Sequence, residues 1–167
     1  LTRAFNRNEE AEAAYRKAIE LDPKLPNPRS SLAGLLTLSG RNLGEALIEA
    51  AKAYCLDPSL ACAQYIFRKI CFTHTESLRS VLPEVSHWCT QHPDDQSVLS
   101  FMVEAWIAYA KVTSASAARE LLDAQPDEVK LAFETVRDAF LAHDDKDHLH
   151  RLAPERRAPV LKLLERL

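Results

Sequence analysis

The segment HDDKDHLH (143–150) holds three histidines and three aspartates, the side chains best suited to bind a metal ion. Imidazole nitrogens and carboxylate oxygens are common ligands of zinc and other divalent cations. The segment lies where a predicted helix ends and a loop begins, so its side chains should point in different directions. We therefore expect a solvated polar loop. A metal-dependent function at His143–His150 is kept as an alternative.

A second candidate is HWCTQH (87–92), with His87, Cys89 and His92. On a helix the first two side chains would point about 200° apart, so they would not share a ligand. The chain contains no phosphate-binding loop, dinucleotide-binding fingerprint, nucleophile elbow or HExxH motif. We therefore expect no enzymatic activity, no catalytic, metal-binding or cofactor-binding residues, and no cofactor.

The composition of the chain predicts an all-α fold. Its 167 residues include only three glycines, and 47% of them are hydrophobic. Tight-turn β architectures usually need more glycine. The net charge of −3 is spread along the chain, which gives no attraction to nucleic acid or to an anionic membrane. No apolar run approaches the roughly 20 residues of a membrane helix, and no signal peptide is visible, so we expect a cytoplasmic protein.

The cysteines fit this location, because no CxxC pair occurs and each lies among apolar neighbours. We expect buried, reduced thiols. If that is wrong, Cys62 and Cys71 are the first disulfide pair to test.

Regularly spaced prolines indicate an internal repeat. Pro23, Pro58 and Pro93 are 35 residues apart, and Pro126 follows after 33. Each proline separates two amphipathic segments, so the repeat unit is predicted to be helix–turn–helix. Such units bury their apolar faces by stacking. The small or apolar positions before the successive prolines are Ala11, Tyr15 and Ala18; Ala46, Ala50 and Ala53; Val81, Val85 and Trp88; and Ser114, Ala118 and Leu121.

These residues resemble the tetratricopeptide repeat family. Its second helix carries alanine, an aromatic residue, alanine and proline at the spacing found in Ala11-Tyr15-Ala18-Pro23, and the next unit differs only at Ala50. The spacing of large and small apolar residues in the first helix of the family's repeat recurs in Leu32, Ala33 and Leu36, and in Leu99, Met102, Val103 and Trp106. The resemblance implies a right-handed α-solenoid of stacked antiparallel helix pairs. Residues 1–126 would form the repeats, and 127–167 a degenerate last unit with a capping helix.

Three features depart from the family pattern. The period is 35 residues where the family has 34, and we expect the extra residue in the turn at 40–46. Trp88 stands where a small alanine is usual, which predicts wider packing. In the third unit, the two neighbouring positions that pack closely against the next helix can be assigned in two ways. Counting from the prolines assigns them to Phe67 and Arg68, whereas the pattern of apolar residues assigns them to Ile66 and Phe67. Burying Arg68 unpaired would be costly, which favours the apolar pattern.

The two ends of the chain carry separate expectations. Residues 1–6 resemble the tail of a helix that begins earlier, so we expect the chain to be part of a longer protein. Residues 127–143 form a clear amphipathic pattern with Phe133, Val136 and Phe140 on one side. A last helix is predicted over 158–167, with Pro159 in its first turn. The apolar residues expected to close the stack are Val160, Leu161, Leu164 and Leu167.

Family resemblance also implies that a peptide or partner helix binds in a concave groove lined by the first helices. The predicted groove residues are Asn27, Ser30 and Ser31; Tyr65 and Lys69, or Gln64 and Arg68 in the alternative register; and Ser100, Phe101 and Glu104. A carboxylate clamp is not recognisable, because Ser30 and Gly34 occupy its positions in the first complete unit. We expect a protein–protein interaction scaffold. The alternative is the recruitment or regulatory arm of a multidomain enzyme whose catalytic domain is absent from this chain. The partner and the oligomeric state are left open.

Overall fold

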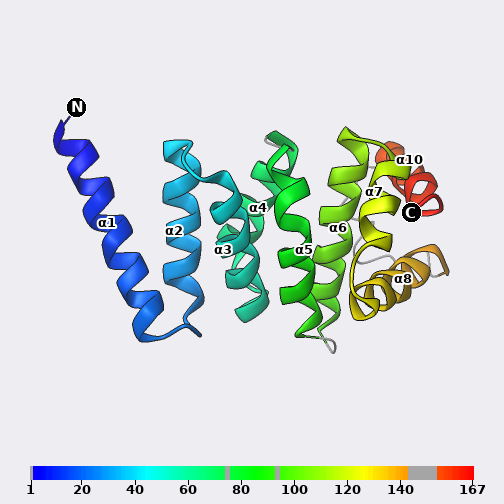
Figure 1. The fold of residues 1–167 in the computed structure, drawn as a ribbon, viewed down its shortest axis with the longest axis horizontal. Helices are drawn as coiled ribbons and strands as arrows, with labels where there is room; N and C mark the ends of the chain where they lie inside the picture. Colours follow the sequence, from blue (N-terminus) through cyan, green and yellow to red (C-terminus); the bar gives the residue numbers. More distant parts are fainter. Residues whose placement is uncertain (1, 74–75, 93–94, 143–153) are drawn as a thin grey trace. The chain divides into compact units, whose positions relative to one another are not determined.

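A computed structural model describes residues 2–73, 76–92, 95–142 and 154–167, and every regular element within them is a helix (Figure 1). No strand occurs in this part of the chain, which confirms the all-α prediction. The helices are α1 (Thr2–Leu21), α2 (Pro26–Ser39), α3 (Leu43–Leu56), α4 (Ala61–Thr73), α5 (Glu76–Thr90), α6 (Gln96–Val112), α7 (Ala115–Asp123), α8 (Asp127–Ala142) and α10 (Pro154–Leu164).

Prolines and capping residues set the limits of these helices. Pro23 and Pro58 lie in the turns that follow α1 and α3, as the 35-residue spacing predicted. At the end of α2, Gly40 adopts a left-handed conformation with φ 63°, which favours glycine. Asn42 then caps α3, since its side-chain oxygen accepts a hydrogen bond from the backbone N–H of Glu45. The turn predicted at 40–46 is thus shorter than expected: it covers residues 40–42, and residues 43–46 already belong to α3.

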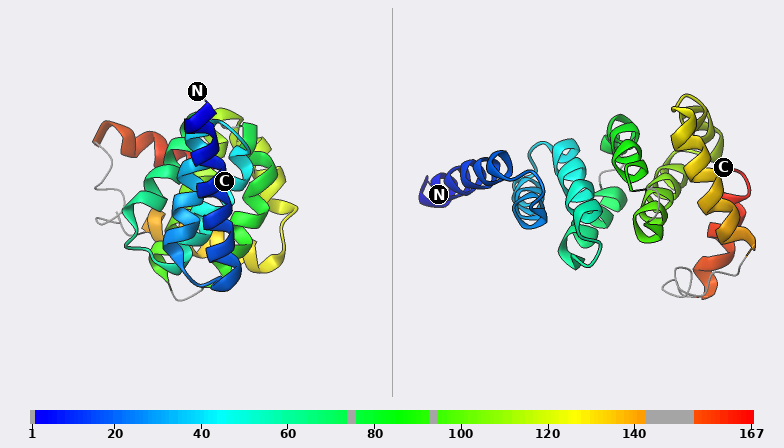
Figure 2. Two further views of the ribbon diagram at one scale, coloured as in Figure 1. Left: turned by 90° about the vertical axis from the view of Figure 1, so that its left-hand side faces the viewer. Right: turned by 90° about the horizontal axis from the view of Figure 1, so that it is seen from below.

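The chain forms two compact units, Leu1–Trp88 and Cys89–Leu167. The boundary between them falls near the end of α5. In the first unit α1 packs on α2, α2 on α3 and α3 on α4. The helices α2 and α4 also pack on each other, and α1 and α2 run antiparallel (Figure 1, Figure 2).

The first unit buries the positions that the repeat pattern selected. Ala46, Ala50 and Ala53 of α3 are fully buried, as are Leu32, Ala33 and Leu36 of α2. Small side chains allow neighbouring helices to approach closely. In α4 the side chain of Phe67 is buried, and Ile66 Cδ1 lies 3.5 Å from where a Cβ on Gly34 would stand. Arg68 is only half-buried. The packing therefore follows the apolar register of the third unit.

The side chains of helix α1 are less buried than those of α2 and α3. Its repeat positions Ala11, Tyr15 and Ala18 are only half-buried, and no described side chain of α1 is fully buried. The helix is continuous from Thr2 to Leu21, so residues 2–6 belong to α1 itself and do not form the tail of a preceding helix.

In the second unit α6 packs against α7, α8 and α10, and α10 also packs against α8. The rings of Trp106 and Phe133 meet edge to face, with centroids 6.2 Å apart and planes at 72°. The helix predicted over 127–143 is confirmed as α8, with Phe133 and Val136 buried. The ring of Phe140 lies outside the described side chains.

Two predictions about the ends of helices in this unit were wrong. Ser114 does not pack. Its hydroxyl caps α7 by accepting a hydrogen bond from the N–H of Ala117. The buried stripe of α7 consists of Ala115, Ala118 and Leu122, with Leu121 half-buried.

The last helix was also placed too late in the sequence. It begins at Pro154, so Pro159 lies inside the helix and not in its first turn. Proline is favoured at the opening of a helix, and Pro154 occupies that place. Val160, Leu164 and Leu167 are buried as predicted, whereas Leu161 is half-buried.

Candidate functional site

Seven of the predicted groove residues lie on the neighbouring helices α2 and α4 of the first unit, and the six that are not buried define the α2–α4 face. They are Asn27, Ser31, Gln64, Tyr65, Arg68 and Lys69. Tyr65 is 65% exposed, which is high for so large a ring. Asn27, Ser31 and Lys69 are also exposed, whereas Gln64 and Arg68 are half-buried.

A polar contact joins the two helices at this face. The Ser30 hydroxyl oxygen lies 3.1 Å from the Cys62 sulfur, at hydrogen-bonding distance. Ser30 neighbours Ser31 on α2, and Cys62 lies one turn before Tyr65 on α4, so the seam runs between the exposed residues of the two helices. Ser30 itself is buried, so it supports the face from below and offers no surface to a partner.

The three predicted residues of α6 belong to the second unit, and two of them are corrected. Ser100 and Phe101 are buried, with Phe101 only 1% exposed. The reason is that α6 is apolar almost all round, since nearly every side chain from Val98 to Ala110 is buried. Glu104 is half-buried and already makes an interaction within the protein. Truncating Phe101 would therefore perturb the core and would not report on a binding surface.

The charge of the α2–α4 face differs from that of the chain as a whole. Neither α2 nor α4 contains an aspartate or glutamate, although the net charge of the chain is −3. Their basic residues are Arg29, Arg68 and Lys69. Arg29 points inward, while Arg68 and Lys69 belong to the face. The face is thus basic and carries an exposed aromatic ring.

Behind this face lies a group of ionic contacts that sequence reasoning missed. The Arg29 guanidinium donates to the Glu49 carboxylate at 2.6 Å and to the carbonyl oxygen of Pro23 at 2.9 and 3.2 Å. Lys52 contacts Glu49 at 3.4 Å and Glu84 at 3.5 Å. The only signal in the sequence is that Arg29 and Glu49 fall among apolar packing positions of their helices.

Lys52 also explains how Trp88 is accommodated in place of a small alanine. The Lys52 ammonium lies 5.0 Å from the centroid of the Trp88 ring, within range of a cation–π interaction. Trp88 is half-buried, so the ring sits at the edge of the helix contact under the lysine and not in its centre.

A second charged cluster surrounds a hollow of about 300 Å³ lined by Glu9, Glu12, Ala13, Arg16 and Arg41. The Arg16 guanidinium donates to the carboxylates of Glu45 and Glu12, and Arg41 donates to Glu12 at 3.0 Å. The hydrogen bond with Glu45, followed by that with Glu12, raises the pKa of Arg16 above its ordinary value. Both arginines are already paired, so this hollow is not suited to bind an anion.

We expect Arg16→Met to lower the free energy of unfolding by no more than about 1 kcal/mol, because the Arg16 side chain is 43% exposed and water screens its ion pairs. Urea unfolding followed by circular dichroism at low and high salt would measure the loss. It should shrink as salt rises. A loss that is large and independent of salt would contradict a solvent-screened interaction.

The sequence also singled out two segments as possible metal sites. The segment His143–His150 lies outside the described residues. Elsewhere, no group of three or more histidine, cysteine or acidic side chains in the described part of the chain could hold a metal ion. His87 is exposed and Cys89 is buried, so the HWCTQH side chains point in different directions as expected.

Three cysteines are described as free thiols. Cys55 and Cys89 are buried as predicted, whereas Cys62, whose sulfur contacts the Ser30 hydroxyl, is exposed. The side chain of Cys71 is outside the described set. None of the described helices is long and apolar enough to cross a lipid bilayer.

Comparisons with known proteins return no relative for this chain: no protein-family model, curated protein or solved structure matches it.

Proposed function

We propose that the chain is a protein–protein interaction scaffold of the tetratricopeptide-repeat kind, and that the α2–α4 face binds a peptide or partner helix. The repeat of 35 residues and the recurring buried positions in α2, α3 and α4 support the repeat architecture. The observation that carries the binding proposal is Tyr65, a 65% exposed ring on a face without acidic residues. Exposed aromatic side chains beside basic groups are typical of interface anchors.

The chemistry of the face indicates how it would recognise its partner. Tyr65 offers apolar area together with a hydroxyl group, and Asn27, Ser31 and Gln64 offer neutral hydrogen-bonding groups. Arg68 and Lys69 also make interactions within the protein, and neither α2 nor α4 carries an acidic residue, so the face favours a peptide that contains carboxylates. Because the residues lie on helices packed against each other, the face is preorganised and little ordering would oppose binding.

Peptide selection tests this proposal. A displayed library of random peptides is panned against the full chain, and each selected peptide is then titrated against Tyr65→Ser/Lys69→Glu. We expect affinity to fall by about tenfold or more, since aromatic and basic anchors dominate such interfaces. Leu21→Ser is the control, because Leu21 is 76% exposed on α1, which contributes no residue to the face.

The outcomes separate the proposal from its rivals. Circular dichroism should show that both variants keep the helical content of the parent chain. Peptides that bind the double variant as tightly as the parent would place the binding surface elsewhere. A library that returns no binder at all would count against a peptide-binding function.

A further inference from the structure

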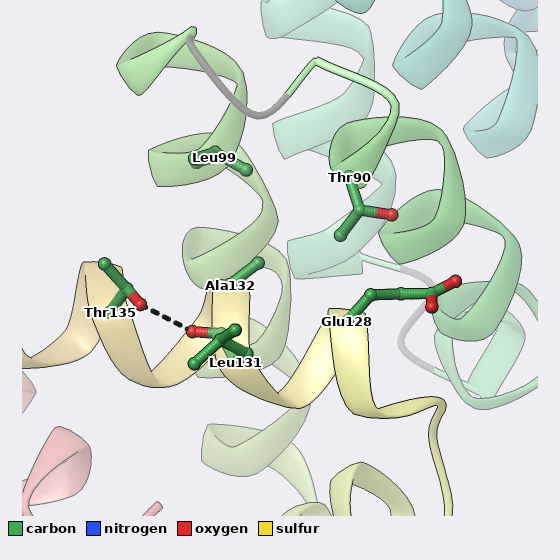
Figure 3. A pocket seen from close by; sticks show the side chains of 6 residues that line it. All are labelled: Thr90, Leu99, Glu128, Leu131, Ala132 and Thr135. Atoms are coloured by element: carbon green, nitrogen blue, oxygen red, sulfur yellow. Dashed lines mark hydrogen bonds between the residues drawn. The ribbon is translucent and has the colours of Figure 1, made fainter.

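A surface pocket of about 320 Å³ lies against α8 in the second unit. It is lined by Thr90, Leu99, Glu128, Leu131, Ala132 and Thr135. Figure 3 shows that four of these side chains come from successive turns of α8, while Leu99 lies on α6 and Thr90 on α5. The volume is at the lower end of the range of ligand pockets, about 300–1,000 Å³. It is large enough for one or two side chains of a partner.

Helix α8 has an apolar stripe that the fold buries and a mixed stripe that borders the pocket. Val129, Phe133 and Val136 are buried in the core of the unit. The other stripe runs from Glu128 to Thr135 along the pocket, and its Leu131 is 67% exposed. A single exposed leucine is unremarkable, but one that borders an apolar pocket suits a helix-in-groove contact.

The polar groups of the pocket do not oppose an apolar occupant. The Thr135 hydroxyl donates to the backbone carbonyl of Leu131 at 2.7 Å, so its hydrogen is already used within α8 (Figure 3). Leu99 and Ala132 add further apolar surface. Glu128 is the one charged residue of the lining.

The acidic residues of α8 indicate which class of partner the pocket would bind. The acidic residues of α8 include Asp127, Glu134 and Asp138, each of which contacts a cation: Lys130 at 2.8 Å, Arg119 at 3.6 Å and Arg137 at 2.8 Å, respectively. The hydrogen bond from Lys130 also lowers the pKa of Asp127.

The Glu128 carboxylate differs from these three. Within the described part of the chain it makes no hydrogen bond or ion pair. Such a carboxylate at the edge of an apolar pocket matches a cation located one helical turn from an apolar anchor.

We propose that this pocket binds a basic amphipathic helix of a partner protein. A leucine-sized side chain of the partner enters between Leu99 and Leu131, and a lysine or arginine one turn away pairs with Glu128. This surface uses none of the residues of the α2–α4 face, so the two sites can be tested independently.

Fluorescence anisotropy with two designed peptides tests the inference on the full chain. The first peptide is a labelled helix of about 15 residues with leucines along one stripe and lysines beside it. The second has glutamates in place of the lysines. We expect saturable binding of the lysine peptide alone, weakened at higher salt. Glu128→Lys and Leu131→Asp should each reduce affinity by about tenfold or more.

Two matched variants control for charge and for general surface effects. Glu120→Lys makes the same charge change at an exposed position of α7 outside the pocket, and Leu38→Asp makes the same change as Leu131→Asp in the first unit. Both should bind the lysine peptide with the affinity of the parent chain.

Four results would overturn the inference. They are absence of saturable binding, equal binding of the glutamate peptide, equal weakening by Glu120→Lys, and self-association of the chain without peptide that Leu131→Asp abolishes. Equal weakening by Glu120→Lys would show that peptide binding depends only on the net charge of the chain. The last would show that a second copy of the chain is the occupant.

Discussion

Glu49→Leu is expected to lower the free energy of unfolding of the first unit by about 3–5 kcal/mol, because it leaves the buried Arg29 guanidinium without its carboxylate. The side chains of this pair are only 9% and 10% exposed, and their contact is 2.6 Å. Two hydrogen bonds to the Pro23 carbonyl fix the guanidinium in place, so it has little freedom to turn toward solvent. Urea unfolding followed by circular dichroism, with hydrogen exchange of peptides from α2 and α3, measures the loss in this unit.

Two further variants show whether burial is the cause. Glu20→Leu makes the same change in the exposed Lys17–Glu20 pair, where both side chains are about two-thirds exposed, and should cost less than about 1 kcal/mol. The double variant Arg29→Met/Glu49→Leu should recover most of the stability, since replacing both partners leaves no unpaired buried charge. If Glu49→Leu cost no more than Glu20→Leu, the pair would not be acting as a buried one.

The sequence was a good guide to the turns after α1 and α3 and a poorer guide to what each side chain faces. Prolines spaced by 35 residues located the turns after α1 and α3, because proline interrupts a helix whatever surrounds it. Periodicity also identified the buried alanines of α3, whose helix has an apolar and a polar side.

Periodicity could not identify the exposed side of a helix that is apolar almost all round. Helix α6 is apolar almost all round, so its spacing gave no reason to prefer one side of the helix, and the buried Phe101 was assigned to the groove. Ser114 was read as a packing position because a cap and a small core residue look alike in sequence. The ion pair of Arg29 with Glu49 joins residues 20 positions apart, and only the packing of α2 on α3 brings them together.

The pocket beside α8 was missed for a related reason. Its lining comes from residues between Thr90 and Thr135, and the stripe on α8 mixes Glu128 and Thr135 with Leu131 and Ala132. A mixed stripe looks like an ordinary solvated side of a helix, so tertiary structure was needed to show what it borders.

Phe133→Ala should destabilise the second unit by about 3–5 kcal/mol, the usual cost of removing a buried aromatic ring. The Phe133 side chain is fully buried on α8 and meets the Trp106 ring edge to face at 6.2 Å. Its removal forfeits burial of the ring and the aromatic contact, and the rigid packing of α6 against α8 leaves a cavity. Urea unfolding by circular dichroism gives the loss of free energy, and hydrogen exchange of α6 and α8 peptides assigns it to this unit.

Leu131→Ala on the same helix is the matched control. Leu131 is 67% exposed, so its truncation should change stability by no more than about 0.5 kcal/mol. The contrast between two apolar truncations two residues apart tests the orientation of α8 directly, since a rotated helix would exchange their effects. Trp106 is fully buried, so its fluorescence should shift toward longer wavelength only in Phe133→Ala. Equal losses in the two variants would mean that α8 does not present Phe133 to the core.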